Sequence, residues 1–126
     1  MPVPADRQYS KEHEWALAES DGTVRIGISE FAQHELGDVI YVELPKAGSR
    51  VTQGEQMGEI ESVKAVSELF SPVTGEVVET NADVNTRPEL VNDDPYAKGW
   101  LVRVKPDGAG GLTGLLDAKA YESLTT

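Results

Sequence analysis

The chain has 126 residues, which is enough for one domain with a modest hydrophobic core. Its 22 acidic and 11 basic residues give a formal charge of −11, which argues against nucleic acid or an anionic membrane as a partner, because both require a basic surface. It contains no cysteine, which excludes disulfides, zinc–thiolate sites and thiol nucleophiles.

The N-terminal part of the chain predicts a tail followed by a β-hairpin. Residues 1–8 contain prolines and show no periodicity, so we expect a flexible tail there. Apolar residues alternate with others in 15–17 and again in 24–28, and the turn-forming residues 20–22 lie between the two runs. This pattern is typical of two antiparallel strands.

A short helix and a buried strand are expected next. Ser29 is a suitable N-cap, apolar residues follow it, and Gly37 fits the first position after a helix. The apolar run 39–42 then predicts a buried strand that ends before Pro45.

The middle of the chain predicts strands on both sides of one lysine. Segments 57–62 and 66–71 have the composition of strands, and Lys64 lies in the turn between them. A further turn at 72–75 leads to a short strand at 77–78.

The C-terminal part predicts a loop, a strand and a helix. Residues 81–98 are polar and rich in turn residues, which predicts a long connection, and 100–104 alternates as a last strand. A helix is expected at about 113–124. Its apolar face would consist of Leu112, Leu115, Leu116, Ala120 and Leu124. Many short strands with peripheral helices predict a mostly β domain over 9–126, built as a compact barrel or sandwich.

The lysine turn lies in a near-palindrome, Glu61-Ser62-Val63-Lys64-Ala65-Val66-Ser67-Glu68. Folding at its centre would place Glu61 opposite Glu68, which is unfavourable, and Lys-Ala lacks the residues that a two-residue hairpin turn prefers. An exposed lysine, with a pKa of about 10.4, is a poor nucleophile, and nothing in the sequence desolvates Lys64, which disfavours a Schiff-base role. Its small apolar neighbours leave the amine open, so we predict that another enzyme modifies it covalently.

Other candidate sites carry weaker signals. His13 lies in Glu12-His13-Glu14, where a solvated polar run is more common than a metal site, so we predict no metal. His13 and His34 lie in different predicted elements, and no nearby serine has the flanking glycines of a nucleophile elbow, which argues against a catalytic triad. The glycine-rich stretch 108–114 lacks the Lys-Ser/Thr of a P-loop and predicts a linker. We therefore expect a protein that is not an enzyme.

The sequence around Lys64 closely resembles the lipoylation segment of glycine cleavage system H proteins. The resemblance covers 61–69 and continues through 71–79. Other matching segments follow in the family's order: 9–15, 27–29, 32–33, 36–38, 41–45, 92–96 and 99–101. In total it extends from about residue 9 to residue 106, and 115–121 resembles the family's terminal helix.

This resemblance implies a barrel-sandwich hybrid of the lipoyl/biotinyl type, with short peripheral helices and a C-terminal helix. Lys64 would lie at a hairpin tip and carry lipoate in amide linkage. Lipoate-attaching enzymes would recognise the residues around it: Glu61, Ser62, Val63, Ala65, Ser67 and Glu68. In the family the loaded arm folds into a surface cleft, and the matching positions here are Glu12, Glu14 and Glu68. Carboxylates there would favour a cationic aminomethyl group.

The resemblance also implies a set of partners. A pyridoxal-phosphate glycine decarboxylase would load an aminomethyl group, a folate-dependent aminomethyltransferase would remove it as a methylene unit with release of ammonia, and dihydrolipoamide dehydrogenase would reoxidise the dithiol. The carrier would be a monomer that meets these enzymes in turn. No apolar run approaches membrane-spanning length and the N-terminus lacks a signal peptide's apolar core. The expected location is the cytoplasm, or the mitochondrial matrix for a processed eukaryotic protein.

Several alternatives remain open. Biotinyl domains usually have Met-Lys-Met at the tip, and lipoyl domains of acyltransferase complexes have Asp-Lys-Ala, whereas this chain has Val63-Lys64-Ala65. A lipoyl relay outside glycine cleavage, or an unmodified interaction module of the same fold, would also retain the hairpin. Modification of Lys64 and restoration of glycine cleavage would separate these alternatives.

Overall fold

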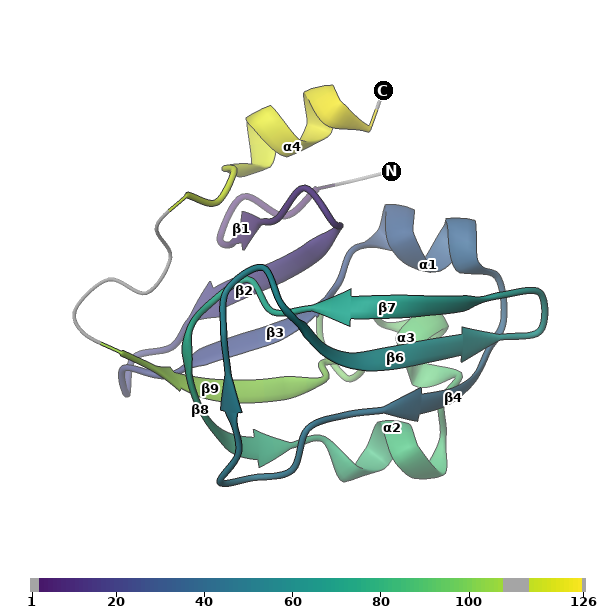
Figure 1. Cartoon of the computed structure of the whole chain (residues 1–126). Coiled ribbons are helices and arrows are strands. Elements are labelled where there is room, and N and C mark those ends of the chain that lie inside the picture. The colour runs from purple at the N-terminus through teal and green to yellow at the C-terminus, as the bar shows by residue number, and fades with distance from the viewer. Residues whose placement is uncertain (1–2, 108–113, 126) are drawn as a thin grey trace.

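The computed structural model describes residues 3–107 and 114–125. Figure 1 shows short strands with helices at the periphery. The elements are β1 (Gln8–Tyr9), β2 (Glu14–Ala18), β3 (Val24–Ile28), α1 (Glu30–Leu36), β4 (Val39–Glu43), β5 (Arg50–Val51), β6 (Gln56–Ser62), β7 (Val66–Phe70), β8 (Gly75–Thr80), α2 (Ala82–Thr86), α3 (Leu90–Asp93), β9 (Val102–Pro106) and α4 (Ala118–Leu124). A mostly β architecture with short helices was predicted, and it is confirmed.

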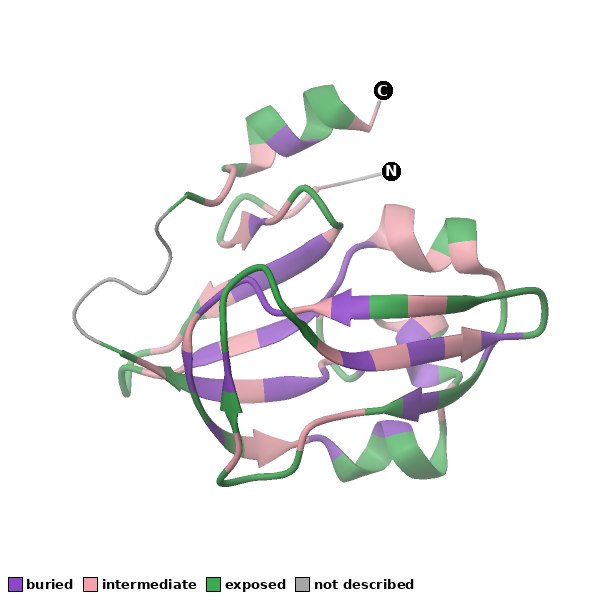
Figure 2. Ribbon diagram, viewed as in Figure 1, coloured by how far each residue is buried: buried purple, intermediate pink, exposed green. Residues whose placement is uncertain are grey.

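Within the described ranges the strands form two antiparallel sheets. One has six strands in the order β1-β2-β3-β9-β8-β5, and the other has three strands in the order β4-β6-β7. Buried residues alternate with more exposed ones along several strands, as Figure 2 shows. In β6, for example, Gly58, Ile60 and Ser62 are buried, and the residues between them are partly exposed.

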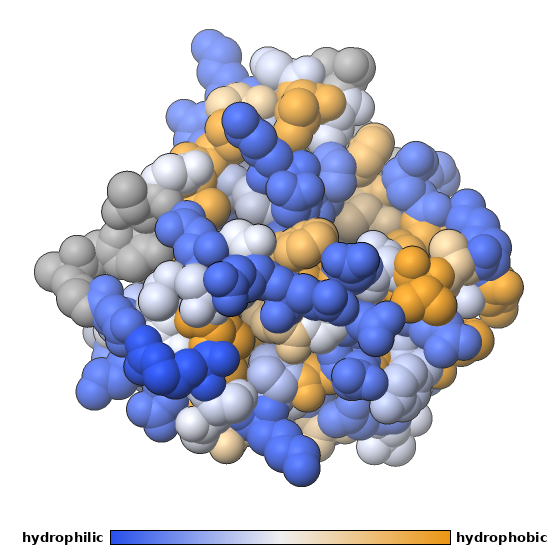
Figure 3. All heavy atoms as spheres, viewed as in Figure 1, coloured by the Kyte–Doolittle hydropathy of each residue, from blue (hydrophilic) through white to orange (hydrophobic). Residues whose placement is uncertain are grey.

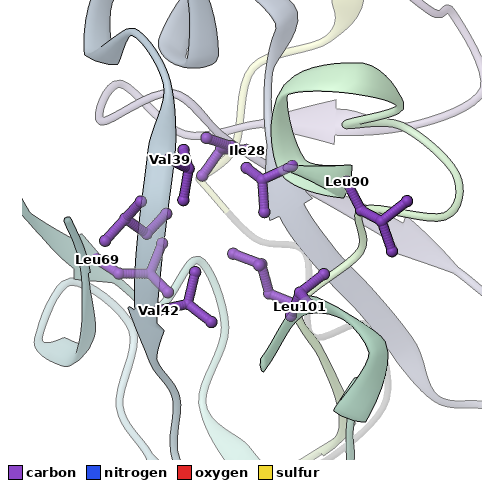
Figure 4. Close-up of a cluster of buried hydrophobic side chains, with 9 residues drawn as sticks. Ile28, Val39, Val42, Leu69, Leu90 and Leu101 are labelled. Atoms are coloured by element: carbon purple, nitrogen blue, oxygen red, sulfur yellow. The ribbon is translucent and has the colours of Figure 1, made fainter. Parts of the chain in front are cut away.

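Two hydrophobic clusters build the core. The first combines residues of both sheets and of the helices: Ile28, Val39, Val42, Ile60, Leu69, Val84, Leu90, Val91 and Leu101 (Figure 4). The second contains Ala16, Val24, Ile26, Val51, Val73, Val77, Val102 and Val104. Leu44 and Met57 pack against both clusters, so the two form one continuous core.

The β6–β7 hairpin has a different register from the one that the palindrome predicts. Glu61 pairs with Val66, and Glu68 pairs with Glu59 instead of Glu61. The turn is therefore centred on Val63-Lys64, not on Lys64-Ala65. Ser62 explains the shift, because its Oγ accepts hydrogen bonds from the backbone N–H groups of Lys64 (3.3 Å) and Ala65 (3.1 Å).

The long connection expected at 81–98 contains two short helices, α2 and α3. They bury Val84, Leu90 and Val91 against the first cluster. The side chain of Asn81 caps α2 by accepting a hydrogen bond from the backbone N–H of Asp83 at 3.1 Å. The sequence predicted a polar, turn-rich connection without helices, which was wrong, because tertiary burial stabilises helices that are too short to be stable alone.

The C-terminal helix begins later than expected. Residues 114–117 are not helical, and α4 begins at Ala118 after the N-cap Asp117; Leu112 and Thr113 lie outside the described residues. The predicted apolar face was only partly right, because Leu115 and Leu116 pack against the core but both precede the helix. Leu124 is 51% exposed, whereas Tyr121 is fully buried.

The segment before residue 9 makes specific contacts, although the sequence placed it in a flexible tail. Gln8 pairs with Ala16 in the β1–β2 ladder. The guanidinium carbon of Arg7 lies 4.6 Å from the centre of the Trp15 ring, and its Nη1 donates a hydrogen bond to the carbonyl of Tyr96 at 2.9 Å. From Arg7 onward, the chain is packed against the first hairpin.

Candidate functional site

Lys64 lies at the free end of the β6–β7 hairpin, which projects from the molecule in Figure 1. Its neighbours Val63 and Ala65 are exposed, Val63 to 67%, and hydrophobic atoms are visible at this end of the molecule in Figure 3. Lys64 is itself exposed, and no ion pair involves it among the described residues. An enzyme can therefore reach the amine without displacing a partner.

The hairpin tip is fixed to the segment between α1 and β4. The backbone N–H of Val63 donates a hydrogen bond to the carbonyl of Asp38 at 3.0 Å. Asn92 of α3 holds the same segment from the other side. Its Oδ1 accepts from the N–H of Val39 (2.8 Å) and its Nδ2 donates to the carbonyl of Gly37 (2.9 Å). The sequence placed Asn92 in the turn-rich connection at 81–98, and only its three-dimensional neighbours reveal the anchoring contacts.

A cleft of about 440 Å³ lies beside the hairpin, between α1, β7 and the segment before β2. Its apolar lining comes from Ile28, Phe31, Ala32, Leu36, Ile60, Ala65, Val66 and Leu69. Its polar lining comes from Glu12, His13, Glu14, Glu35, Ser67 and Glu68. Such a mixture suits an aliphatic chain with a cationic end.

The three predicted arm-cleft residues, Glu12, Glu14 and Glu68, all line this one cleft. Glu12 and Glu68 are exposed and come from different parts of the chain. Glu35 also lines the cleft, and the sequence reasoning missed it. It is four residues after Phe31 in α1, so the helical period could have placed both side chains on the same face.

Glu14 is the buried acid of the cleft, with 2% of its surface exposed. The Ser10 hydroxyl donates a hydrogen bond to its Oε1 at 2.5 Å, and the backbone N–H of Phe70 donates to its Oε2 at 3.2 Å. Both bonds favour the charged form, but burial outweighs them and raises the pKa of Glu14 to about 8. The carboxyl is therefore largely protonated at neutral pH.

The predicted recognition residues are not equivalent in the structure. Ala65, Ser67 and Glu68 line the cleft, and Val63 is exposed at the tip. Ser62 is buried and its hydroxyl is occupied by the turn. Glu61 is partly exposed, on the strand position that faces Val66.

His13 is placed in the cleft wall without the neighbours that a metal ligand needs. Its Nδ1 lies 2.8 Å from the Tyr121 hydroxyl, and burial lowers the pKa of its imidazole, which favours the neutral ring. Among residues 3–107 and 114–125, no group of three or more His, Asp or Glu side chains is arranged to hold a metal ion. None of the helices in those ranges is long and apolar enough to cross a membrane.

Comparison with known proteins gives a consistent result over nearly the whole chain. A family model described as glycine cleavage H-protein matches residues 7–126. The glycine cleavage system H protein of Beutenbergia cavernae is 54% identical over 127 residues, covering 100% of this chain and 98% of that protein. The H protein of Thermus thermophilus is 52% identical over 124 residues, covering 98% and 96%.

A solved structure agrees with these sequence matches. The crystal structure of a glycine cleavage system H protein from Mycobacterium marinum matches this fold with a TM-score of 0.88 at 41% identity. The match covers 96% of this chain and 97% of that chain. The predicted fold class is therefore confirmed.

Proposed function

Because this chain belongs to the glycine cleavage H-protein family, we propose that it is a lipoyl carrier of a glycine cleavage system and not an enzyme. The observation that carries the proposal is an exposed lysine, Lys64, at a hairpin tip whose flank forms the wall of an acid-lined cleft. The geometry suits a covalently attached arm that extends to partners and returns to the cleft.

The residues present fit lipoate. Lys64 would hold it in amide linkage, because its amine is open and its neighbours are small or exposed. When bound, the dithiolane supplies a sulfur that accepts an aminomethyl group and a dithiol that can be reoxidised. This chain has no cysteine, so it offers no competing thiol of its own.

The cleft residues would protect the cargo in two ways. Apolar side chains such as Phe31, Ile60 and Leu69 exclude water from the floor. The carboxyl groups of Glu12, Glu14 and Glu68 attract a cationic group through charge-assisted hydrogen bonds. A cation beside Glu14 also favours its charged form, so cargo binding and proton release from this carboxyl are coupled.

The carrier would meet its partners in turn. Loading falls to a pyridoxal-phosphate glycine decarboxylase, removal to the folate-dependent aminomethyltransferase, and reoxidation to dihydrolipoamide dehydrogenase, after lipoate-attaching enzymes have modified Lys64. We propose a monomer that acts as a single domain over 9–126. The bacterial origin of the relatives favours the cytoplasm over the mitochondrial matrix.

The first test is the modification of Lys64 itself. Mass spectrometry of protein from its native host should find one lipoyl group on the Lys64 peptide. Lys64→Arg should keep the fold and lose glycine cleavage in a reconstituted system, because arginine cannot form the amide. Lys105→Arg, at an exposed lysine of β9, is the matched control and should remain active.

The outcomes separate the alternatives. Residual glycine cleavage in Lys64→Arg would contradict the site. A biotinyl mass would identify a different carrier. Lysine that stays unmodified after exposure to a competent lipoate ligase would instead support an interaction module of the same fold. A lipoylated protein that fails to support glycine cleavage would indicate a lipoyl relay.

A further inference from the structure

Tyr121 connects the C-terminal helix to the back of the cleft. It is fully buried, and its ring stacks on Tyr9 with 4.6 Å between the ring centres. Its hydroxyl lies 2.8 Å from Nδ1 of His13 and 2.6 Å from Oγ of Ser29, which is hydrogen-bonding distance to both. Figure 1 shows α4 lying outside β1, so these contacts reach inward from the surface of the molecule.

His13, one of the two contacts, holds an uncommon backbone conformation. Its φ is +73°, and no other non-glycine residue that the structure describes has a positive φ. This conformation is unfavourable for a residue with a side chain and persists where its surroundings impose it. The carbonyl of His13 accepts a hydrogen bond from the backbone N–H of Ser29 at 3.0 Å, and Tyr121 fixes the ring. The residues on either side of His13 are the cleft acids Glu12 and Glu14.

Ser29, the other contact, begins the opposite wall of the cleft. Its Oγ caps α1 by accepting a hydrogen bond from the N–H of Ala32 at 3.1 Å. Helix α1 contributes Phe31 and Glu35 to the cleft lining. The Tyr121 hydroxyl therefore adds a side-chain link between the segment with Glu12 and Glu14 and the helix with Glu35, beside the backbone bond from Ser29 to His13.

We propose that Tyr121 is a positioning residue that holds these two acid-bearing walls at a fixed separation. The role rests on the proposed function, because it assigns to the C-terminal helix a part in shielding the carried group. Tyr121 does not line the cleft, so it acts only through His13 and Ser29. A buried tyrosine needed for packing alone would require the ring and not the hydroxyl.

Tyr121→Phe separates the two roles, because it keeps the ring stack and removes the hydroxyl. Tyr9→Phe is the matched control: Tyr9 belongs to the same stack, but its hydroxyl donates to the carbonyl of Pro4 at 2.6 Å, away from the cleft. Tyr121→Phe loses the hydroxyl contacts to His13 and Ser29, and Tyr9→Phe loses one hydrogen bond of a buried tyrosine. Only the first should affect the acids of the cleft.

The first readout uses the full chain without lipoate. In nuclear magnetic resonance spectra, Tyr121→Phe should shift the Nδ1 resonance of His13, because that nitrogen loses its partner. It should also lower the pKa of Glu14, read from its carboxyl carbon, by about one unit as water enters between the walls. Tyr9→Phe should leave both signals in place. Unchanged His13 and Glu14 signals in Tyr121→Phe would overturn the proposal.

The second readout uses lipoylated protein loaded by the decarboxylase with glycine. Tyr121→Phe should release the bound aminomethyl group about two- to tenfold faster than the parent chain, the range that the net contribution of one hydrogen bond spans. Release at the parent rate would also overturn the proposal. If the parent chain cannot be lipoylated or loaded, the proposed function fails instead, and the readout without lipoate still decides the positioning role.

Discussion

At the scale of single residues, Glu14 shows how burial sets the charge of the cleft. Its pKa is raised from about 4.5 to about 8 mainly because its carboxyl is removed from water. Between these two values the folded protein binds a proton that the unfolded chain has released. The free energy of unfolding therefore falls as the pH rises from about 4.5 to about 8. At higher pH it stays lower by the full cost of burying the charged carboxylate.

Replacing Glu14 with glutamine should remove this dependence. The amide has the shape of the protonated acid and cannot ionise, so Glu14→Gln should be more stable than the parent chain near pH 9 by a few kcal/mol at most. Near pH 5 the two should differ little. Urea unfolding at both pH values tests this difference. The comparison changes only residue 14, because the other cleft residues His13, Glu12, Glu35 and Glu68 are present in both proteins.

An equal stability difference at the two pH values would show that Glu14 ionises as easily in the folded protein as in the unfolded chain. Glu68→Gln is a suitable control, because Glu68 lines the same cleft but is exposed.

At the scale of secondary-structure elements, Asn92 links α3 to the lysine hairpin. Besides the backbone of Gly37 and Val39, its Nδ2 donates to Oε1 of Gln33 in α1 at 3.0 Å. The segment that it holds carries Asp38, whose carbonyl binds the N–H of Val63. The Asn92 amide therefore helps to hold the hairpin tip on the domain, together with the β4–β6 ladder.

Asn92→Asp should loosen this link. The new oxygen would face the oxygens of Gly37 and Gln33, which leaves two acceptors without a donor and costs about 1–3 kcal/mol of stability. We expect faster hydrogen exchange at the Val63 amide and slower lipoylation of Lys64 by a purified ligase. Asn85→Asp, an exposed position in α2, is the control. Unchanged exchange at Val63 would show that the hairpin is fixed by other contacts.

The same elements show what could be predicted from the sequence. The strands on both sides of Lys64 and the cap of α1 at Ser29 follow from local patterns, and the structure confirms them. The hairpin register does not follow from the palindrome. Hydrogen bonds from the backbone N–H groups of Lys64 and Ala65 to the Ser62 hydroxyl favour the turn centred on Val63-Lys64 instead. Helices α2 and α3 are short and polar, so only their burial against the core distinguishes them from a loop.

The cleft shows the same division between local and tertiary information. The family resemblance suggested Glu12, Glu14 and Glu68, and the structure brings all three to one cleft. The sequence pattern did not single out Tyr121, because the spacing of the leucines favoured a different face of the last helix. Tyr121 is buried through a ring stack and a hydroxyl network that involve residues far away in sequence.

At the scale of the whole molecule, the two ends of the described chain are joined by the contacts around β1 and α4. Tyr9 and Leu116 exchange backbone hydrogen bonds, with N···O distances of 2.8 and 2.7 Å. Tyr9, Trp15 and Tyr121 form a third cluster, with Leu116 and Ala118 packed against it. The C-terminal segment thus covers the first hairpin and completes the core on that side.

A chain that ends at Asp107 should therefore fold but be less stable. It would expose the rings of Tyr9 and Trp15 and lose the burial of Tyr121, at a cost of about 3 kcal/mol or more, which corresponds to a melting temperature lower by about 10 °C. Thermal unfolding followed by circular dichroism measures the shift. A chain ending at Leu124 is the control, because it keeps the whole cluster and should melt with the parent. An unchanged midpoint for the shorter chain would mean that the two sheets hold the fold without the C-terminal segment, and that α4 serves the cleft alone.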